Sequence, residues 1–207
     1  MKDNFSVQAS GYAKFRPHYP AEMIQYIVSM VDEKRTALDV ATGNGQVALA
    51  LAPFFNKVYA TDISEKQLQH AETAPNIYYS IASAENLGFE DGSFDLITVG
   101  QAIHWFNFDA FYKEVKRLLK PDGVFAVLGY GLFSAGEEVD KVLRYLYKDV
   151  LGGYWDAERK YVDENYRTIP FPFKEIQVKN FENHFQWSLE QLLGYLDTWS
   201  AVQHYIK

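Results

Sequence analysis

The chain has 207 residues, with 20 lysines and arginines against 27 aspartates and glutamates, so its net charge at neutral pH is −7. This length predicts a single domain, and a composition that is 48% hydrophobic and 23% charged is typical of a globular protein with a sizeable core. The acidic balance argues against unspecific capture of nucleic acid, which requires clustered lysine and arginine.

Cysteine is absent, which excludes disulfides, thiolate zinc sites and cysteine nucleophiles. The histidines lack the spacing of a metal site, so no metal is predicted. Residues 1–12 contain no apolar leader, and the longest apolar run, residues 47–55, is too short to cross a bilayer. We therefore expect a cytoplasmic protein with no membrane-spanning segment.

Predicted strands and helices alternate along the first two thirds of the chain. Helices are expected where apolar residues recur every three or four positions, and strands where short apolar runs end at turn residues. The predicted helices are residues 21–31, 46–52, 64–72 and 108–119, the last ended by Lys-Pro-Asp-Gly at 120–123, and the predicted strands are residues 37–41, 58–61, 77–81, 94–99 and 124–128. This alternation predicts the α/β class, with a doubly wound, Rossmann-like parallel sheet.

The pattern changes after Gly129. Apolar spacing over residues 139–150 predicts one longer amphipathic helix, residues 173–187 are predicted as one or two edge strands, and a capping box at Ser188 and Gln191 predicts a last helix. We thus expect one domain over residues 1–207. Its predicted parts are a lid at residues 1–20, a cofactor-binding core at 21–129, a helical cap at 130–166, and edge strands with a carboxyl-terminal helix at 167–207.

The first predicted strand runs into a glycine-rich loop, Asp-Val-Ala-Thr-Gly-Asn-Gly at residues 39–45. Glycines allow a tight turn beneath a ligand, and the following helix presents free N–H groups to it. Asp62 ends the next strand, where a carboxylate suits a ribose diol. The residues predicted to bind a ligand here are Asp39, Ala41, Thr42, Gly43, Gly45, Asp62 and Ile63.

Two ligands fit this pattern. Residues 43–48 match the dinucleotide fingerprint G-x-G-x-x-A, which favours an NAD-type oxidoreductase. A carboxylate at Asp39 would repel a pyrophosphate but suits an ammonium, and S-adenosylmethionine has an ammonium and no phosphate. Asp39 can also be read as one half of a structural salt bridge, since an unpaired buried acid is costly.

The ordered motifs resemble the class I S-adenosylmethionine-dependent methyltransferases over most of the chain. Residues 39–45 resemble their first motif, D-x-G-x-G-x-G, with Ala41 in place of one glycine. Asp62 matches the ribose-binding acid. Residues 83–87, Ser-Ala-Glu-Asn-Leu, resemble the adenine-binding turn D-A-E-x-L, in which Ser83 replaces the aspartate. The resemblance adds Ser83, Ala84 and Glu85 to the expected cofactor site, although Ser83 can also simply end a strand.

A narrower resemblance is to the methyltransferase type 11 branch that contains the trans-aconitate methyltransferases. It rests on residues 12–20, on Gln-Ala-Ile-His-Trp-Phe at 101–106, and on residues 193–200. The branch acts on small molecules, often acids. Such proteins usually add a last antiparallel strand beside the fifth, and this strand is expected to be missing from the chain.

The resemblance implies roles for five further residues. Tyr12 and Arg16 are expected to fold over the cofactor, with Arg16 on the methionine carboxylate, and Gln101 is expected to contact the cofactor. His104 and Trp105 follow the fourth strand, where the acceptor is expected, and are the candidate catalytic residues. Each also has a structural interpretation: Arg16 as a surface residue, Tyr12 and Trp105 as packing, and His104 as a hydrogen-bonded structural histidine.

The predicted reaction is methyl transfer from S-adenosylmethionine to a small molecule, with a carboxylic acid as one acceptor class. A carboxylate acceptor is already ionised and needs only orientation by His104, whereas a hydroxyl or phenol would make His104 the base. An oxidoreductase and a non-catalytic S-adenosylmethionine-binding protein are the alternatives. The oligomeric state does not follow from the sequence.

Overall fold

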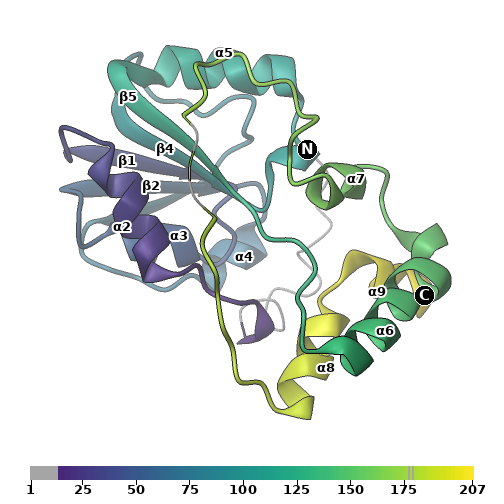
Figure 1. Ribbon diagram of the computed structural model, residues 1–207. Helices are drawn as coiled ribbons and strands as arrows, with labels where there is room; N and C mark the ends of the chain where they lie inside the picture. The colour runs from purple at the N-terminus through teal and green to yellow at the C-terminus, as the bar shows by residue number, and fades with distance from the viewer. Residues whose placement is uncertain (1–13, 177, 179) are drawn as a thin grey trace.

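The computed structural model describes residues 14–176, 178 and 180–207. Its centre is a parallel sheet in the order β3-β2-β1-β4-β5. The strands are β1 (Thr36–Val40), β2 (Lys57–Asp62), β3 (Ile77–Ile81), β4 (Phe94–Gly100) and β5 (Leu119–Leu128). The predicted fold class is thereby confirmed (Figure 1). No antiparallel strand joins β5 among the described residues.

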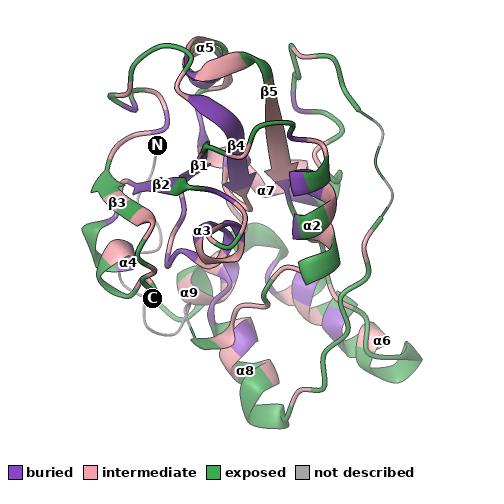
Figure 2. Cartoon of the chain, turned by 90° about the vertical axis from the view of Figure 1, so that its left-hand side faces the viewer, coloured by how far each residue is buried: buried purple, intermediate pink, exposed green. Residues whose placement is uncertain are grey.

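Helices cover both faces of the sheet, so the central strands β1 and β4 are buried on both sides (Figure 2). Leu38 and Val40 of β1 pack with α5 on one face, whereas Ala37 packs with α2 and α3 on the other. The helices that flank the sheet are α2 (Ala21–Ser29), α3 (Gln46–Leu51), α4 (Glu65–Gln69) and α5 (Phe108–Leu118). Because β1 and β4 are neighbours whose helices lie on opposite faces, a crevice is expected at their carboxyl ends.

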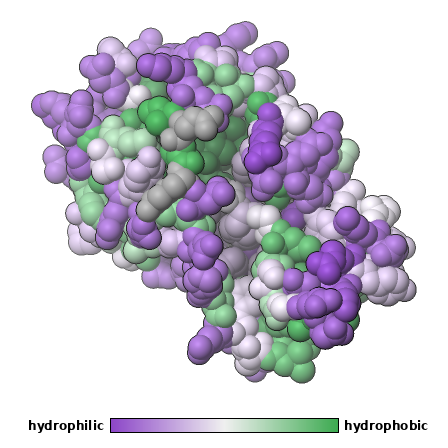
Figure 3. All heavy atoms as spheres, in the orientation of Figure 1, coloured by the Kyte–Doolittle hydropathy of each residue, from purple (hydrophilic) through white to green (hydrophobic). Residues whose placement is uncertain are grey.

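A second lobe follows β5 and contains its own apolar cluster. It is built by α6 (Glu137–Tyr145), the π-helical turn η3 (Leu146–Val150), η4 (Gly152–Tyr154), α7 (Arg159–Asp163), α8 (Leu189–Asp197) and α9 (Ser200–Tyr205). Trp199 and Tyr195 from the carboxyl-terminal helices pack there against Leu143 and Tyr147. The cap thus recruits α8 and α9, which the sequence analysis assigned to a separate carboxyl-terminal part. Figure 3 shows the surface hollowed between this lobe and the sheet.

The predicted edge strands at residues 173–187 are wrong for the described part of that segment, which forms no strand. Aromatic side chains attach this segment to the rest of the protein, in place of the backbone hydrogen bonds of a strand. Phe173 packs on Tyr112 and Phe125 with ring centroids 5.6 and 5.4 Å away, and Phe181 lies 5.5 Å from Tyr26 of α2. In the described part of this segment only Phe173, Phe181 and Trp187 are half-buried, so the chain crosses beside the sheet on a few aromatic contacts.

Two predicted boundaries also change. β5 begins at Leu119, and the Lys-Pro-Asp-Gly stretch belongs to it, because the pairing with β4 shifts register between Phe94 and Leu96 and leaves these residues bulged. The helix predicted for residues 64–72 ends at Gln69, where backbone bonds from His70 and Ala71 tighten to three-residue spacing. The capping box at Ser188 is confirmed.

Candidate functional site

The loop between β1 and α3 turns on two glycines with left-handed backbone, at φ +58° for Gly43 and +84° for Gly45. A Cβ on Gly45 would lie 2.2 Å from the hydroxyl oxygen of Tyr79, which donates a 2.7 Å hydrogen bond to the carbonyl of Glu72. A Cβ on Gly43 would meet nothing closer than the Gln67 amide oxygen at 3.9 Å. Tyr79 therefore fills the space beside Gly45. The space beside Gly43 is open, and Gly43 lines a cavity.

Ala41 has a left-handed backbone as well, with φ +54°. This conformation costs a residue with a Cβ about 1 to 2 kcal/mol. We expect Ala41→Gly to raise the free energy of unfolding by about 0.5 to 1 kcal/mol, because the strain relieved exceeds the cost of about 0.4 to 1 kcal/mol from the added flexibility of the unfolded chain. Urea denaturation without ligand measures this. Ala37→Gly, in the extended part of β1, is the control and should destabilise the protein; equal stability of Ala41→Gly and the parent would contradict the expectation.

Asp39 is 1% exposed, on the α3 side of the sheet. Its carboxylate accepts hydrogen bonds from the hydroxyls of Thr42 at 2.5 Å and Thr98 at 2.8 Å. Burial raises the pKa of Asp39 to about 6, and the two threonine bonds oppose that rise. Within the described residues no cation is among the groups that shift its pKa, so the interpretation as a structural salt bridge has no support there.

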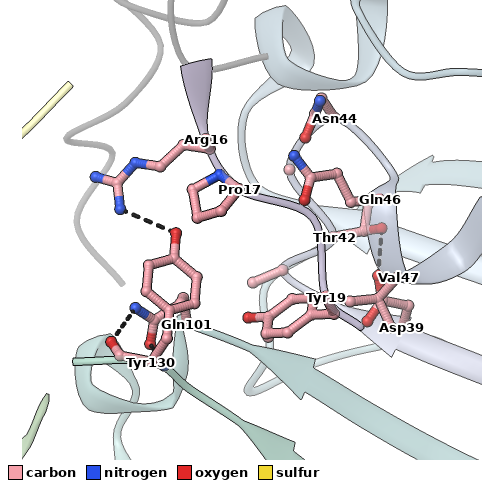
Figure 4. Close-up of a pocket in the computed structure, with 13 residues that line it drawn as sticks. Arg16, Pro17, Tyr19, Asp39, Thr42, Asn44, Gln46, Val47, Gln101 and Tyr130 are labelled. Carbon is pink, nitrogen blue, oxygen red and sulfur yellow. Dashed lines mark hydrogen bonds between the residues drawn. The ribbon is translucent and has the colours of Figure 1, made fainter. Parts of the chain in front are cut away.

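A first cavity opens over the glycine loop (Figure 4). In this view Asp39 and Thr42 lie on one side, Arg16 and Gln101 lie on the other, and Pro17 and Tyr19 are drawn between them. The predicted residues Asp39, Ala41, Thr42, Gly43, Arg16 and Gln101 all line it. The structure thus places an acidic and a basic side chain at opposite ends of one cavity.

Arg16 connects this cavity to the cap. Its Nη1 donates to the hydroxyl of Tyr130 at 3.2 Å, and its Nη2 donates to the carbonyl of Thr198 at 3.1 Å. The guanidinium also lies 5.5 Å from the ring centroid of Tyr195. Arg16 is therefore a half-buried, oriented residue rather than a loose surface arginine. Tyr12, predicted beside it, lies outside the described residues.

Asp62 ends β2 next to the glycine loop. One carboxylate oxygen accepts the Gly43 N–H and the other the Ser64 N–H, each at 2.8 Å. Asp62 therefore ties the loop to β2, a structural role that sequence reasoning missed. Ile63 follows Asp62 and is half-buried. Neither residue lines the first cavity.

The predicted adenine turn forms a compact local structure. Ser83 shares a hydrogen bond with the Glu85 carboxylate and pairs with Asn86 as an isolated bridge, while Ala84 is buried in the core. Burial opposes ionisation of Glu85, yet the bonds from Ser83 and from the Asn107 N–H lower its pKa below the ordinary value. These three residues lie outside both cavities.

A second cavity adjoins the first and shares Arg16 and Gln101 with it. His104 and Trp105, the candidate catalytic residues, line it from the end of β4, and Arg159 faces them from α7. The cavity is lined by Arg16, Gln101, His104, Trp105, Trp155, Asp156, Arg159, Val162, Trp199 and Ser200. Two arginines and one aspartate therefore meet there between aromatic walls.

Arg159 is held rigidly. Its guanidinium lies 4.7 Å from the ring centroid of Trp155, and its Nε donates to the Tyr147 hydroxyl at 2.7 Å and to Asp163 at 3.3 Å. His104 stands nearby and is 7% exposed. Burial and the positive charge of Arg159 lower the pKa of His104 to about 4, so its imidazole is neutral at neutral pH.

Sequence reasoning missed Tyr130 and Arg159, which line these cavities, and Tyr166, which lies outside both. Tyr130 bonds Arg16, Tyr166 bonds His104, and Arg159 lines the second cavity. They come from the cap, whose helical pattern does not show which polar side chains turn inward. Their enrichment in tyrosine and arginine, in a segment already predicted to cover the site, was the one available signal.

A methyltransferase domain model matches residues 38–127. A methyltransferase of Dictyostelium discoideum is 36% identical over 99% of this chain and 80% of its own length. The solved structure of a type II methyltransferase from Anaeromyxobacter dehalogenans has 40% identity and a TM-score of 0.85, covering 92% of this chain and 81% of that one.

A yeast S-adenosylmethionine-dependent methyltransferase from Saccharomyces cerevisiae is 29% identical over 80% of this chain and 59% of its own length. The chain belongs to the class I S-adenosylmethionine-dependent methyltransferases. The family implies S-adenosylmethionine as the methyl donor. The narrower resemblance to trans-aconitate methyltransferases stays a prediction.

Among the described residues, no helix combines the length and the apolar character needed to cross a membrane. No cluster of three or more histidine, aspartate or glutamate side chains suited to a metal ion occurs in this part of the chain.

Proposed function

We propose that this protein transfers a methyl group from S-adenosylmethionine to a small carboxylic acid held in the second cavity. The observation that carries the proposal is the pairing of the two cavities through Arg16 and Gln101: one fits the amino-acid end of the donor, the other an anion. When bound, the donor supplies an activated methyl group on a positively charged sulfur. Everything else is positioning and exclusion of water by the chain.

The first cavity suits a zwitterionic amino-acid end. Asp39, buried without a counter-ion among the groups that act on it, would bind the ammonium, and Arg16 at the other end would bind the carboxylate. Gly43 leaves room for backbone approach. A pyrophosphate would instead meet the Asp39 carboxylate, which disfavours the NAD-type alternative. Asp62 and Ile63 would hold the ribose, and Ser83 to Glu85 the adenine.

The second cavity suits an anionic acceptor. Arg16 and Arg159 outnumber Asp156 among its charged residues, and His104 is neutral. A carboxylate is already ionised at neutral pH, so methylation at its oxygen requires no base, and a histidine with a pKa of about 4 would be a weak one. The rings of Trp105, Trp155 and Trp199 would cover the rest of a small organic acid. With a net charge of −7, the chain is poorly suited to a nucleic-acid acceptor.

Donor binding is tested by calorimetry with S-adenosylhomocysteine and NAD side by side; tight binding of NAD alone would contradict the assignment of the first cavity.

The acceptor is tested by transfer of radiolabelled methyl groups to small carboxylic acids and to their amides. We expect methyl esters from the acids only. Arg159→Gln should raise the acceptor KM about tenfold or more, whereas Arg144→Gln, on the exposed side of α6, should leave it unchanged. Equal methylation of acids and amides would exclude the carboxylic-acid proposal.

The amino-terminal segment is expected to close over the bound donor, because Arg16 lines the first cavity and would bind the methionine carboxylate there. Trypsin cleavage after Lys14 should slow about tenfold or more at saturating S-adenosylhomocysteine, since proteolysis follows the population of the open form. Cleavage after Lys174, in the exposed segment beside the sheet, is the internal control and should not change. Equal cleavage after Lys14 with and without ligand would contradict the prediction that this segment closes over the donor.

A further inference from the structure

Gln101 occupies a strained position at the end of β4, with a left-handed φ of +52°. Its amide faces the backbone of Tyr130 in both directions: Nε2 donates to the Tyr130 carbonyl at 2.9 Å, and the Tyr130 N–H donates to Oε1 at 3.3 Å. A carbonyl oxygen can only accept, so the orientation of the amide is fixed. Oε1 is therefore an acceptor at a known place.

Tyr166 stands between this amide and His104. Its hydroxyl oxygen lies 3.1 Å from Gln101 Oε1 and 3.1 Å from His104 Nδ1. Because Oε1 carries no proton, the first contact is a hydrogen bond only if Tyr166 donates its single hydroxyl proton to it. The second contact then requires His104 Nδ1–H to be the donor.

Left-handed backbone and a close glycine contact fix the position of the Tyr166 ring. Asn165 and Tyr166 both have left-handed φ, at +52° and +60°, and a Cβ on Gly129 would lie 2.5 Å from the Tyr166 ring. The imidazole of His104 stacks on the same ring with centroids 5.9 Å apart. Three strained residues and one close glycine contact thus maintain a chain of hydrogen bonds that ends at His104.

Nε2 is the ring nitrogen of His104 that Tyr166 does not engage. His104 lines the second cavity, whereas Tyr166 does not. Burial and Arg159 keep the imidazole neutral at neutral pH, which leaves one ring proton, on Nδ1. Nε2 then carries a lone pair.

We propose that Gln101 and Tyr166 are positioning residues that hold His104 in the Nδ1–H tautomer, so that Nε2 accepts a hydrogen bond from the methyl acceptor in the second cavity. This deepens the proposed function, on which its acceptor part rests. A neutral Nε2 disfavours a carboxylate oxygen beside it, so Arg159 holds the acceptor carboxylate and His104 selects acids that also carry an O–H or N–H group.

The tautomer is tested without any ligand. In protein labelled with ¹⁵N-histidine, the couplings of ring nitrogens to ring protons show which nitrogen is protonated, and His104→Gln assigns the signals. We expect protonated Nδ1 and bare Nε2 at pH 7. Tyr166→Phe should allow the Nε2–H form, whereas Tyr145→Phe, an exposed tyrosine of α6, should change nothing. A predominant Nε2–H form in the parent protein would overturn the proposal, whatever the activity.

The acceptor contact is tested with a matched pair of acids, mandelate and phenylacetate, which differ by one hydroxyl. The parent protein should methylate mandelate with a kcat/KM about tenfold higher, the usual effect of one hydrogen bond. In Tyr166→Phe the ratio should fall toward one while the KM for S-adenosylmethionine stays constant. A ratio of one in the parent would overturn the contact. If neither acid is methylated, the carboxylic-acid function fails, and the tautomer measurement still decides the positioning roles.

Discussion

Asp39→Asn is expected to stabilise the protein at pH 7 and to abolish most of its affinity for S-adenosylhomocysteine. Burial raises the pKa of Asp39 from 3.8 to about 6, so the folded state holds a proton that the unfolded chain has already lost between these values. The free energy of unfolding therefore falls as pH rises through that window, by up to about 3 kcal/mol. Asparagine is neutral throughout and avoids this loss.

Affinity should change in the opposite direction. Loss of a charge-assisted bond to an ammonium costs about 1.5 to 3 kcal/mol, which is roughly ten- to hundredfold in Kd. In the parent protein, the affinity for S-adenosylhomocysteine should fall about tenfold per pH unit below pH 6, because binding requires the ionised carboxylate. Denaturation and calorimetry between pH 4 and 8 measure both effects.

Asp95 provides a control of opposite sign. Burial opposes its ionisation, but hydrogen bonds from Lys120 and Thr36 outweigh burial and lower its pKa. The Lys120 Nζ lies 2.5 Å from one oxygen, and the other accepts the Thr36 N–H at 2.8 Å. Asp95→Asn should therefore destabilise the protein at pH 7. If Asp39→Asn also destabilises it at pH 7 and keeps its affinity, Asp39 is a structural residue and not the ammonium site.

Gly45→Ala is expected to destabilise the protein by about 2 to 4 kcal/mol. Two effects add: a left-handed backbone costs about 1 to 2 kcal/mol, and the new methyl group overlaps the Tyr79 hydroxyl. That hydroxyl cannot simply move, since it is bonded to the Glu72 carbonyl. Thermal and urea unfolding without ligand measure the loss.

Gly43→Ala separates the two effects. It has the same kind of backbone but open space, so it should cost only about 1 to 2 kcal/mol. Gly45→Ala combined with Tyr79→Phe should recover part of the loss, because the closest overlapping atom is gone. Equal destabilisation by the two glycine substitutions would mean that the Tyr79 hydroxyl does not limit the space beside Gly45.

Local patterns determined much of the fold. The α/β alternation, the five strands and the glycine turn after β1 all depend on residues close together in the sequence. Apolar periodicity, turn residues and helix caps report such short-range preferences directly. The same patterns were misleading at residues 173–187, whose described part forms no strand and contacts Tyr112 and Phe125 through Phe173.

The sequence by itself also predicted Asp39, Ala41, Thr42 and Gly43 of the first cavity, because they occupy one short motif. Only the tertiary structure decided the environment of each group. Burial raises the pKa of Asp39, and a hydrogen bond from Thr98, 59 residues away, opposes that rise. His104 owes its orientation to Tyr166, 62 residues away in the cap. Such contacts arise when distant elements pack together, and the spacing of residues along one strand or helix contains no record of them.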